Sequence, residues 1–189
     1  MTISNDDELR RGLEQASSLL QEIQDYLGRD FSKSAKVRFP RGYIRTATIA
    51  RKKINFVQPE ALKSNISYTM MLTDVQHWLL ARTDLAGTAR EMVIKLQIFL
   101  IGTIIESVTK AYLKGKCGDG YKRRTNYLLA EGLISDELKA DLDWLWDVRN
   151  KMHLFQVTDS EWLSKDYSVE NHNRAMRAFN ELLSCLSPH

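Results

Sequence analysis

Residues 88–114 read TAREMVIKLQIFLIGTIIESVTKAYLK and form the most apolar segment of this 189-residue chain. Between Met92 and Val108, apolar side chains recur so often that a helix built from the segment would be apolar nearly all round. Such a helix is stable in water when other helices surround it. Glu91 follows Thr88 at the spacing of a capping box, which predicts the helix start. The segment therefore predicts the central element of a helical bundle.

The cellular setting is predicted from the apolar runs and the cysteines. The run at 98–105 is much shorter than the roughly 18 residues of a membrane span, and polar residues flank it. The N-terminus is acidic and lacks the apolar stretch of a signal peptide. Cys117 and Cys185 form no CxxC pair. We therefore expect a cytoplasmic protein with no membrane association, no metal site and no cofactor.

Amphipathic patterns predict further helices on both sides of this segment. A first helix is expected from Asp6 or Asp7 to about Leu27, because apolar residues recur on one face and Gly28 follows. Others are expected at 67–82, after a helical turn at Pro59, then near 125–131, from Ser135 onward and at 169–186. The prediction is an all-α fold over 1–189, a single helical domain arranged as an antiparallel bundle.

Residues 29–58 interrupt the helical pattern with a basic segment, predicted to be an irregular insertion, either a loop or a short hairpin. Cations and aromatic residues alternate there, a composition that suits single-stranded nucleic acid. The expected nucleic-acid-binding residues are Arg38, Arg41, Tyr43, Arg45, Arg51, Lys52 and Lys53. The alternative is a solvated excursion whose aromatic side chains pack on the bundle.

A polar group appears where the apolar stripe of the helix expected from Ser135 onward reaches Arg149. The stripe runs through Leu138, Leu142 and Leu145, and the next position is Arg149. An arginine at such a place requires a partner or a polar cleft. On a helix, His153 would lie one turn further along the same face. The two side chains could then act on one phosphate.

Arginine and histidine together supply what metal-independent RNA cleavage needs. His153 can take the proton of a 2′-hydroxyl as general base, and Arg149 can stabilise the phosphate anion that this hydroxyl attacks. Glu106, on the apolar central segment, could orient either side chain. The alternative is structural: Arg149 pairs with Asp147 or Glu106 inside the bundle, and His153 packs near a helix end.

An Arg-Asn pair followed by His on a late helix, preceded by a long apolar helix with a polar residue, resembles the HEPN superfamily of helical, usually dimeric domains. The resemblance covers roughly 88–186. It implies a composite ribonuclease site at a dimer interface, with Arg149 and His153 catalytic, Asn150 supporting them and Glu106 in the position of a family carboxylate. Three residues separate Arg149 from His153, one fewer than the usual minimum of four.

Three functions follow as hypotheses. The first is a HEPN-like, metal-independent endoribonuclease of a defence or toxin type that works as a homodimer. The second is a noncatalytic helical module for dimerisation or for a protein partner such as a cognate antitoxin. The third is an RNA-binding regulator that acts through the basic segment alone.

Overall fold

The computed structural model describes residues 2–152 and 165–187. These residues form helices, turns and irregular segments without a strand, so the prediction of an all-α fold is confirmed. The chain divides into two compact units, Met1–Pro40 and Arg41–His189. The division falls inside the predicted basic insertion 29–58.

The first unit contains one long helix, α1 (Asp6–Leu27), as predicted. Its N-cap is Asn5 rather than Asp6 or Asp7, because the Asn5 side chain accepts a hydrogen bond of 2.9 Å from the backbone N–H of Glu8. Gly28 follows the last turn with a φ of 56°, a conformation that glycine adopts without steric cost.

The second unit begins with two helices that differ from the sequence prediction. Residues 47–53 were expected in a loop or hairpin and instead form α2 (Ala47–Lys53), whose N-cap Thr46 accepts a hydrogen bond from Ile49 N–H. Residues after Pro59 form one continuous helix, α3 (Glu60–Arg82), instead of a separate turn and a later helix. The basic segment is therefore partly helical.

The apolar segment forms α4 (Gly87–Tyr112), which contacts α3, α5, α6 and α7. The predicted capping box is not formed: the N-cap is Ala86, which makes no side-chain hydrogen bond. By length and composition α4 could cross a membrane, but half of its most apolar window is buried in the protein, as in the core helix of a soluble fold.

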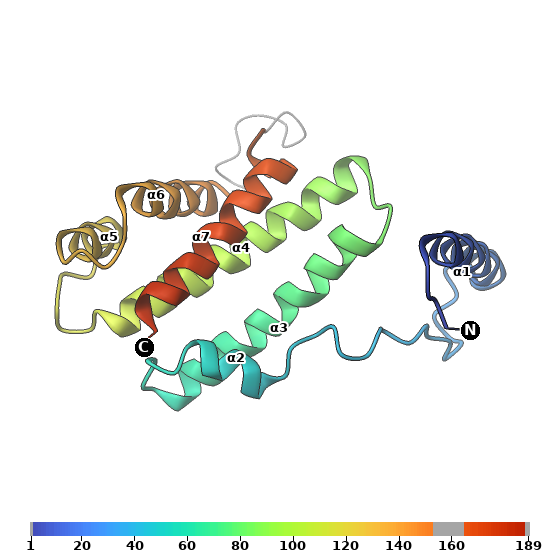
Figure 1. Cartoon of the computed structure of the whole chain (residues 1–189), viewed down its shortest axis with the longest axis horizontal. Helices are drawn as coiled ribbons and strands as arrows, with labels where there is room; N and C mark the ends of the chain where they lie inside the picture. The colour runs from blue at the N-terminus through green and yellow to red at the C-terminus, as the bar shows by residue number, and fades with distance from the viewer. Residues whose placement is uncertain (1, 153–164, 188–189) are drawn as a thin grey trace. The chain divides into compact units, whose positions relative to one another are not determined.

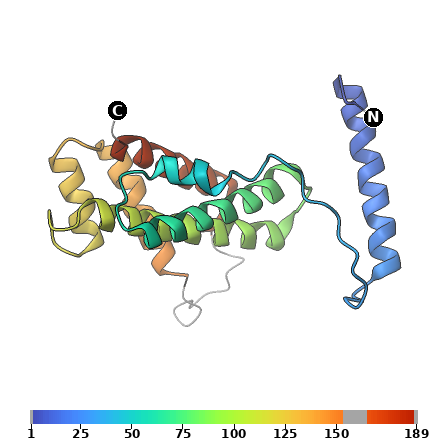
Figure 2. The same cartoon turned by 90° about the horizontal axis from the view of Figure 1, so that it is seen from below.

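The chain continues through α5 (Tyr121–Ala130), α6 (Asp136–Asn150), the short 3₁₀ turn η3 (Lys165–Tyr167) and α7 (Val169–Leu186). Ser135 caps α6 and Ser168 caps α7, each through a side-chain oxygen that accepts a backbone N–H. Figures 1 and 2 show α3 running antiparallel to α4, whereas α7 runs in the same direction as α4. Neighbouring helices are therefore not all antiparallel.

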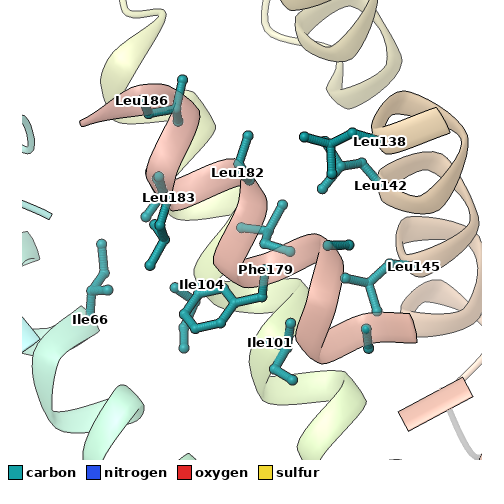
Figure 3. Packing of buried hydrophobic residues seen from close by; sticks show 14 of the residues in the cluster. Ile66, Ile101, Ile104, Leu138, Leu142, Leu145, Phe179, Leu182, Leu183 and Leu186 are labelled. Carbon is teal, nitrogen blue, oxygen red and sulfur yellow. The ribbon is translucent and has the colours of Figure 1, made fainter. Parts of the chain in front are cut away.

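The core of the second unit lies where α4 packs against α3, α6 and α7. In Figure 3, leucines of α6 face α7 from one side, and isoleucines of α3 and α4 lie on the other. Burial of these side chains is the main term that stabilises the unit. The buried side chains in this view include Ile66, Ile101, Ile104, Leu138, Leu142, Leu145, Phe179, Leu182, Leu183 and Leu186.

Candidate functional site

The structure brings together three of the four residues predicted to be catalytic. Glu106 lies on α4, and Arg149 and Asn150 lie at the end of α6. Arg149 Nη2 is 3.1 Å from Glu106 Oε2, and Arg149 Nη1 donates a hydrogen bond of 3.1 Å to Asn150 Oδ1. The fourth residue, His153, lies outside the described residues.

Arg149 sits at the margin of the core. The stripe of α6 is buried through Leu145, and Val148 is the buried residue of the next turn. The Arg149 side chain keeps 21% of its surface exposed, and that of Glu106 keeps 31%. This placement allows the guanidinium to lie against the core and still reach solvent, so its charge is not fully desolvated.

Gly102 makes the approach of Arg149 to α4 possible. It is buried one turn before Glu106, and a Cβ atom on it would lie 3.1 Å from Arg149 Cγ and 3.2 Å from Arg149 Cβ. A larger residue would require Arg149 to give way by a few tenths of an ångström. The glycine therefore positions Arg149 beside Glu106.

Two aromatic rings flank the guanidinium. Its central carbon is 5.1 Å from the centroid of the Trp146 ring and 5.7 Å from that of Phe99. Trp146 is itself held by Tyr121, with ring centroids 4.4 Å apart and planes 2° from parallel. Cation–π contacts of this kind hold an arginine in place without using its N–H donors.

Arg149 retains donors for a ligand. A guanidinium has about five N–H donors, and the ion pair with Glu106 and the hydrogen bond to Asn150 engage one terminal nitrogen each. Arg149 Nε is buried and has no hydrogen-bond partner among residues 2–152 and 165–187. Because Nε is buried, the donors left for a phosphate oxygen are the second N–H groups of Nη1 and Nη2, while Glu106 holds the guanidinium in place.

Other carboxylates of α6 are paired with different cations. Asp143 binds Lys139 at 2.7 Å and accepts a hydrogen bond from Thr125, and Asp147 binds Lys122 at 3.2 Å. The alternative that Arg149 pairs with Asp147 therefore does not occur in the described structure. Among the carboxylates described, Glu106 is the partner of Arg149.

The two tryptophans of α6, Trp144 and Trp146, have separate environments. Trp146 lies against Tyr121 and Arg149, whereas Trp144 lies 4.3 Å from the Arg174 guanidinium, measured to the ring centroid. Arg174 also binds Asp141 at 2.6 Å, and 31% of its side chain is exposed. Arg174 thus makes the same kinds of contact as Arg149.

The predicted nucleic-acid-binding residues divide into two groups. Arg45 donates from Nε to Asp74 Oδ2 at 2.8 Å, and Arg51 donates to Ser64 Oγ at 3.1 Å, so both have partners on α3 instead of facing solvent freely. Tyr43 is half-buried. The exposed cations are Arg38, in the first unit, and Arg41, Lys52 and Lys53, in the second.

The structure also contains a buried polar cluster that sequence reasoning did not find. The His77 and His172 rings stack with centroids 5.9 Å apart, and His172 Nε2 lies 3.0 Å from Gln97 Oε1. Burial lowers the pKa of His172, and the nearby charges of His77 and Arg90 act in the same direction, while the hydrogen bond with Asn173 opposes them. The residues are too far apart in sequence for any local spacing to have indicated the cluster.

The part of the chain that the structure describes contains no preformed metal-binding site. Within it, no group of three histidine, cysteine, aspartate or glutamate side chains converges. Comparisons with protein-family models, curated proteins and solved structures give no match.

Proposed function

We propose that this chain is a HEPN-like helical bundle domain that cleaves RNA without a metal ion, with Arg149 and His153 as catalytic residues. The observation that supports the proposal is the grouping of Glu106, Arg149 and Asn150 across α4 and α6. An arginine with spare donors, held at the margin of the core four residues before a histidine, suits phosphate chemistry. The proposed setting is cytoplasmic.

The reaction is an internal displacement at phosphorus. His153 removes the proton from a ribose 2′-hydroxyl, the 2′-oxygen bonds to the adjacent phosphorus, and the bond from phosphorus to the 5′-oxygen breaks. The leaving oxygen takes a proton from the second His153 of a dimer. The products are a 2′,3′-cyclic phosphate and a 5′-hydroxyl end.

Arg149 stabilises the negative charge that accumulates on the phosphate oxygens during this step. Glu106 and Asn150 are positioning residues, because each holds one terminal nitrogen of the guanidinium and leaves the second N–H of that nitrogen for a phosphate oxygen. Phe99 and Trp146 limit rotation of the group further. A preorganised cation costs little reorganisation during the reaction.

A homodimer is part of the proposal, with α4 as its contact surface. Although α4 is the most apolar helix, a row along it is only half-buried, and Leu96 within this row is 49% exposed. Phe99 belongs to the row and touches Arg149. A second copy covering this surface would place two Arg149 sites close together. The row consists of Met92, Leu96, Phe99, Leu100 and Thr103.

The second candidate function is a noncatalytic module for dimerisation or for a protein partner such as an antitoxin. The observation that favours it is that Arg149 already has an acidic partner inside its own chain. A third, RNA binding without cleavage, is favoured by the exposed Arg38, Arg41, Lys52 and Lys53. All three functions can be separated by one set of variants.

The test incubates the purified chain with mixed single-stranded RNA in EDTA and analyses the ends of the products. We expect cleavage with 2′,3′-cyclic phosphate ends, reduced roughly 100-fold or more by Arg149→Ala and by His153→Ala. Arg174→Ala is the matched control, since Arg174 is also ion-paired and also lies over a tryptophan. It should leave cleavage unchanged.

Other results would select another function. Cleavage that survives both Arg149→Ala and His153→Ala contradicts the proposed site. RNA binding without cleavage, weakening steeply with salt and lost when Lys52 and Lys53 are replaced by Gln, supports the RNA-binding regulator. If neither activity exists and Arg149→Ala and Arg174→Ala destabilise the fold equally, Arg149 is a structural residue.

A further inference from the structure

Within the unit Met1–Pro40, the helix α1 has an apolar stripe that is exposed at its first four positions and half-buried at Ile23 and Leu27. We name this stripe the α1 seam. Its side chains follow one another at alternating steps of four and three residues: Leu9, Leu13, Ala16, Leu20, Ile23 and Leu27. Within residues 2–152 and 165–187, no residue of α1 counts as buried, and Leu13 and Leu20 are 56% and 48% exposed. An amphipathic helix of this kind needs a partner surface.

The spacing indicates the shape of the partner. Alternating steps of four and three keep a stripe facing a second helix along its whole length, as in a coiled coil. The 22 residues of α1 contain about three such heptads, or roughly 33 Å of helix. Residues 33–37 lie beside the C-terminal half of the seam and leave an open groove of about 910 Å³, lined by Leu20, Ile23 and Val37 among others. The surface therefore suits another helix.

The charge of α1 argues against nucleic acid and against an anionic membrane as the partner. The helix carries six carboxylates, three of them in its first turn, and two arginines. Phosphate groups would be repelled by this balance, whereas helices that lie on membranes are rich in lysine and arginine. The partner is a protein helix.

We propose that the partner is α1 of a second copy of the chain, packed antiparallel. In this arrangement each large residue of the seam meets a seam residue of the other helix: Leu20 faces Ala16, Leu13 faces Ile23, and Leu27 faces Leu9. The residues that directly precede Leu13, Leu20 and Leu27 flank the seam on one side. There, Leu19 of one copy meets Leu19 of the other, and Gly12 of each copy meets Tyr26 of the other. The α1 seam is therefore complementary to itself.

Charge selects the antiparallel orientation over the parallel one. A parallel pair would place the first turns together, with Asp6, Asp7 and Glu8 of both copies adjacent. An antiparallel pair separates these carboxylates and brings Asp7 near Arg29 of the other copy. It also aligns the two helix dipoles favourably. In the parallel pair, moreover, apolar Leu19 would face polar Gln24.

Disulfide formation tests both the pairing and its direction in the full-length chain. In a background with Cys117→Ser and Cys185→Ser, one preparation carries Ala16→Cys and the other carries Leu20→Cys with a distinguishing tag. The antiparallel pair predicts a mixed disulfide between the two preparations and little disulfide within either one. Disulfides in Ala16→Cys alone would show parallel pairing and overturn the proposal. Absence of any disulfide would also overturn it.

Sedimentation equilibrium supplies the energetic test. We expect Leu13→Glu, on the seam, to raise the dimer dissociation constant roughly tenfold or more. Gln15→Glu adds the same charge off the seam and should change the constant less than about twofold. Equal constants for both variants would contradict the proposal. Circular dichroism checks that α1 remains helical in each.

This pairing is independent of the proposed ribonuclease activity. The seam variants lie outside the Glu106–Arg149 group, and Leu96→Glu addresses the α4 surface alone. The mixed disulfide should persist in the Leu96→Glu and Arg149→Ala variants. If RNA is not cleaved but the mixed disulfide forms, the proposed function fails and the α1 pairing stands. If RNA is cleaved but the mixed disulfide does not form, the α1 pairing fails and the proposed function stands.

Discussion

At the scale of single residues, Gly102 sets how closely α4 and α6 approach beside Arg149. A Cβ at this position would lie 3.1 Å from Arg149 Cγ and 3.2 Å from Arg149 Cβ, and the second atom is fixed by the backbone of α6. The site therefore depends on a residue that carries no functional group. Sequence reasoning did not identify it, because a glycine within a helix gives no sign of what packs on it.

We expect Gly102→Ala to lower the free energy of unfolding by about 1 kcal/mol, because overpacking outweighs the gain in helix propensity. Urea denaturation measures the change. Gly12→Ala is the control: its new Cβ would lie 3.5 Å from Ile3 Cδ1, an ordinary contact, so this variant should not destabilise the chain. A Gly102→Ala variant more stable than the wild type would contradict the close packing of Arg149 on α4.

His172 gives a second prediction at this scale. Burial lowers its pKa in the folded chain, so the unfolded chain binds the proton first as the pH falls. The stabilisation is fully present above the unfolded pKa of about 6.5 and is lost as the pH falls through the lower folded value. Unfolding free energies at pH 7.5 and at pH 5 should therefore differ less in His172→Gln than in the wild type. Equal pH dependence would contradict a buried, neutral imidazole.

At the scale of elements, Arg45 and Asp74 connect the segment before α2 to α3. Asp74 Oδ2 accepts hydrogen bonds of 2.8 Å from both the backbone N–H and the Nε of Arg45. The two side chains are 19% and 11% exposed, so the pair is largely desolvated. The basic segment is thereby held by an acid 29 residues away, and Arg45 has a structural role, while its contact with RNA stays a prediction.

We expect Asp74→Asn to destabilise the second unit by about 2 kcal/mol, because it leaves a largely buried guanidinium without its counter-charge. Thermal and urea denaturation measure this loss. Asp84→Asn is the matched control, since Asp84 is exposed in the connection between α3 and α4, and its effect should be within about 0.5 kcal/mol of zero. Equal effects of both substitutions would show that the Arg45–Asp74 pair does not stabilise the fold.

At the scale of the whole molecule, charge and apolar surface are distributed unequally. The acidic α1 belongs to the unit Met1–Pro40, whereas Arg149, the half-buried row of α4 and most of the basic segment's candidate residues belong to the unit Arg41–His189. The proposed self-association of α1 and the proposed chemistry of α4 and α6 therefore concern different units.

Local sequence was sufficient for the helices whose signals are local. The helix 169–186 and the end of α1 at Leu27 agree with the prediction, because an apolar stripe, a serine or asparagine cap and a following glycine act within one or two turns. Where local signals conflicted, as in residues 47–53, the predicted loop or hairpin was wrong. Pro59 and the basic residues suggested a break and a loop, but Ala50 and Ile54 are fully buried, and their packing stabilises α2.

The sequence by itself therefore determined an all-helical chain, an apolar central helix and the presence of Arg149 at the margin of an apolar stripe. Only the tertiary structure decided that Glu106, not Asp147, is the partner of Arg149, that Gly102 admits it, and that His172 meets Gln97 across 75 residues. The physical reason is that periodicity within a helix specifies which face is buried but not which other helix covers it. Contacts between distant residues arise only when the faces pack together.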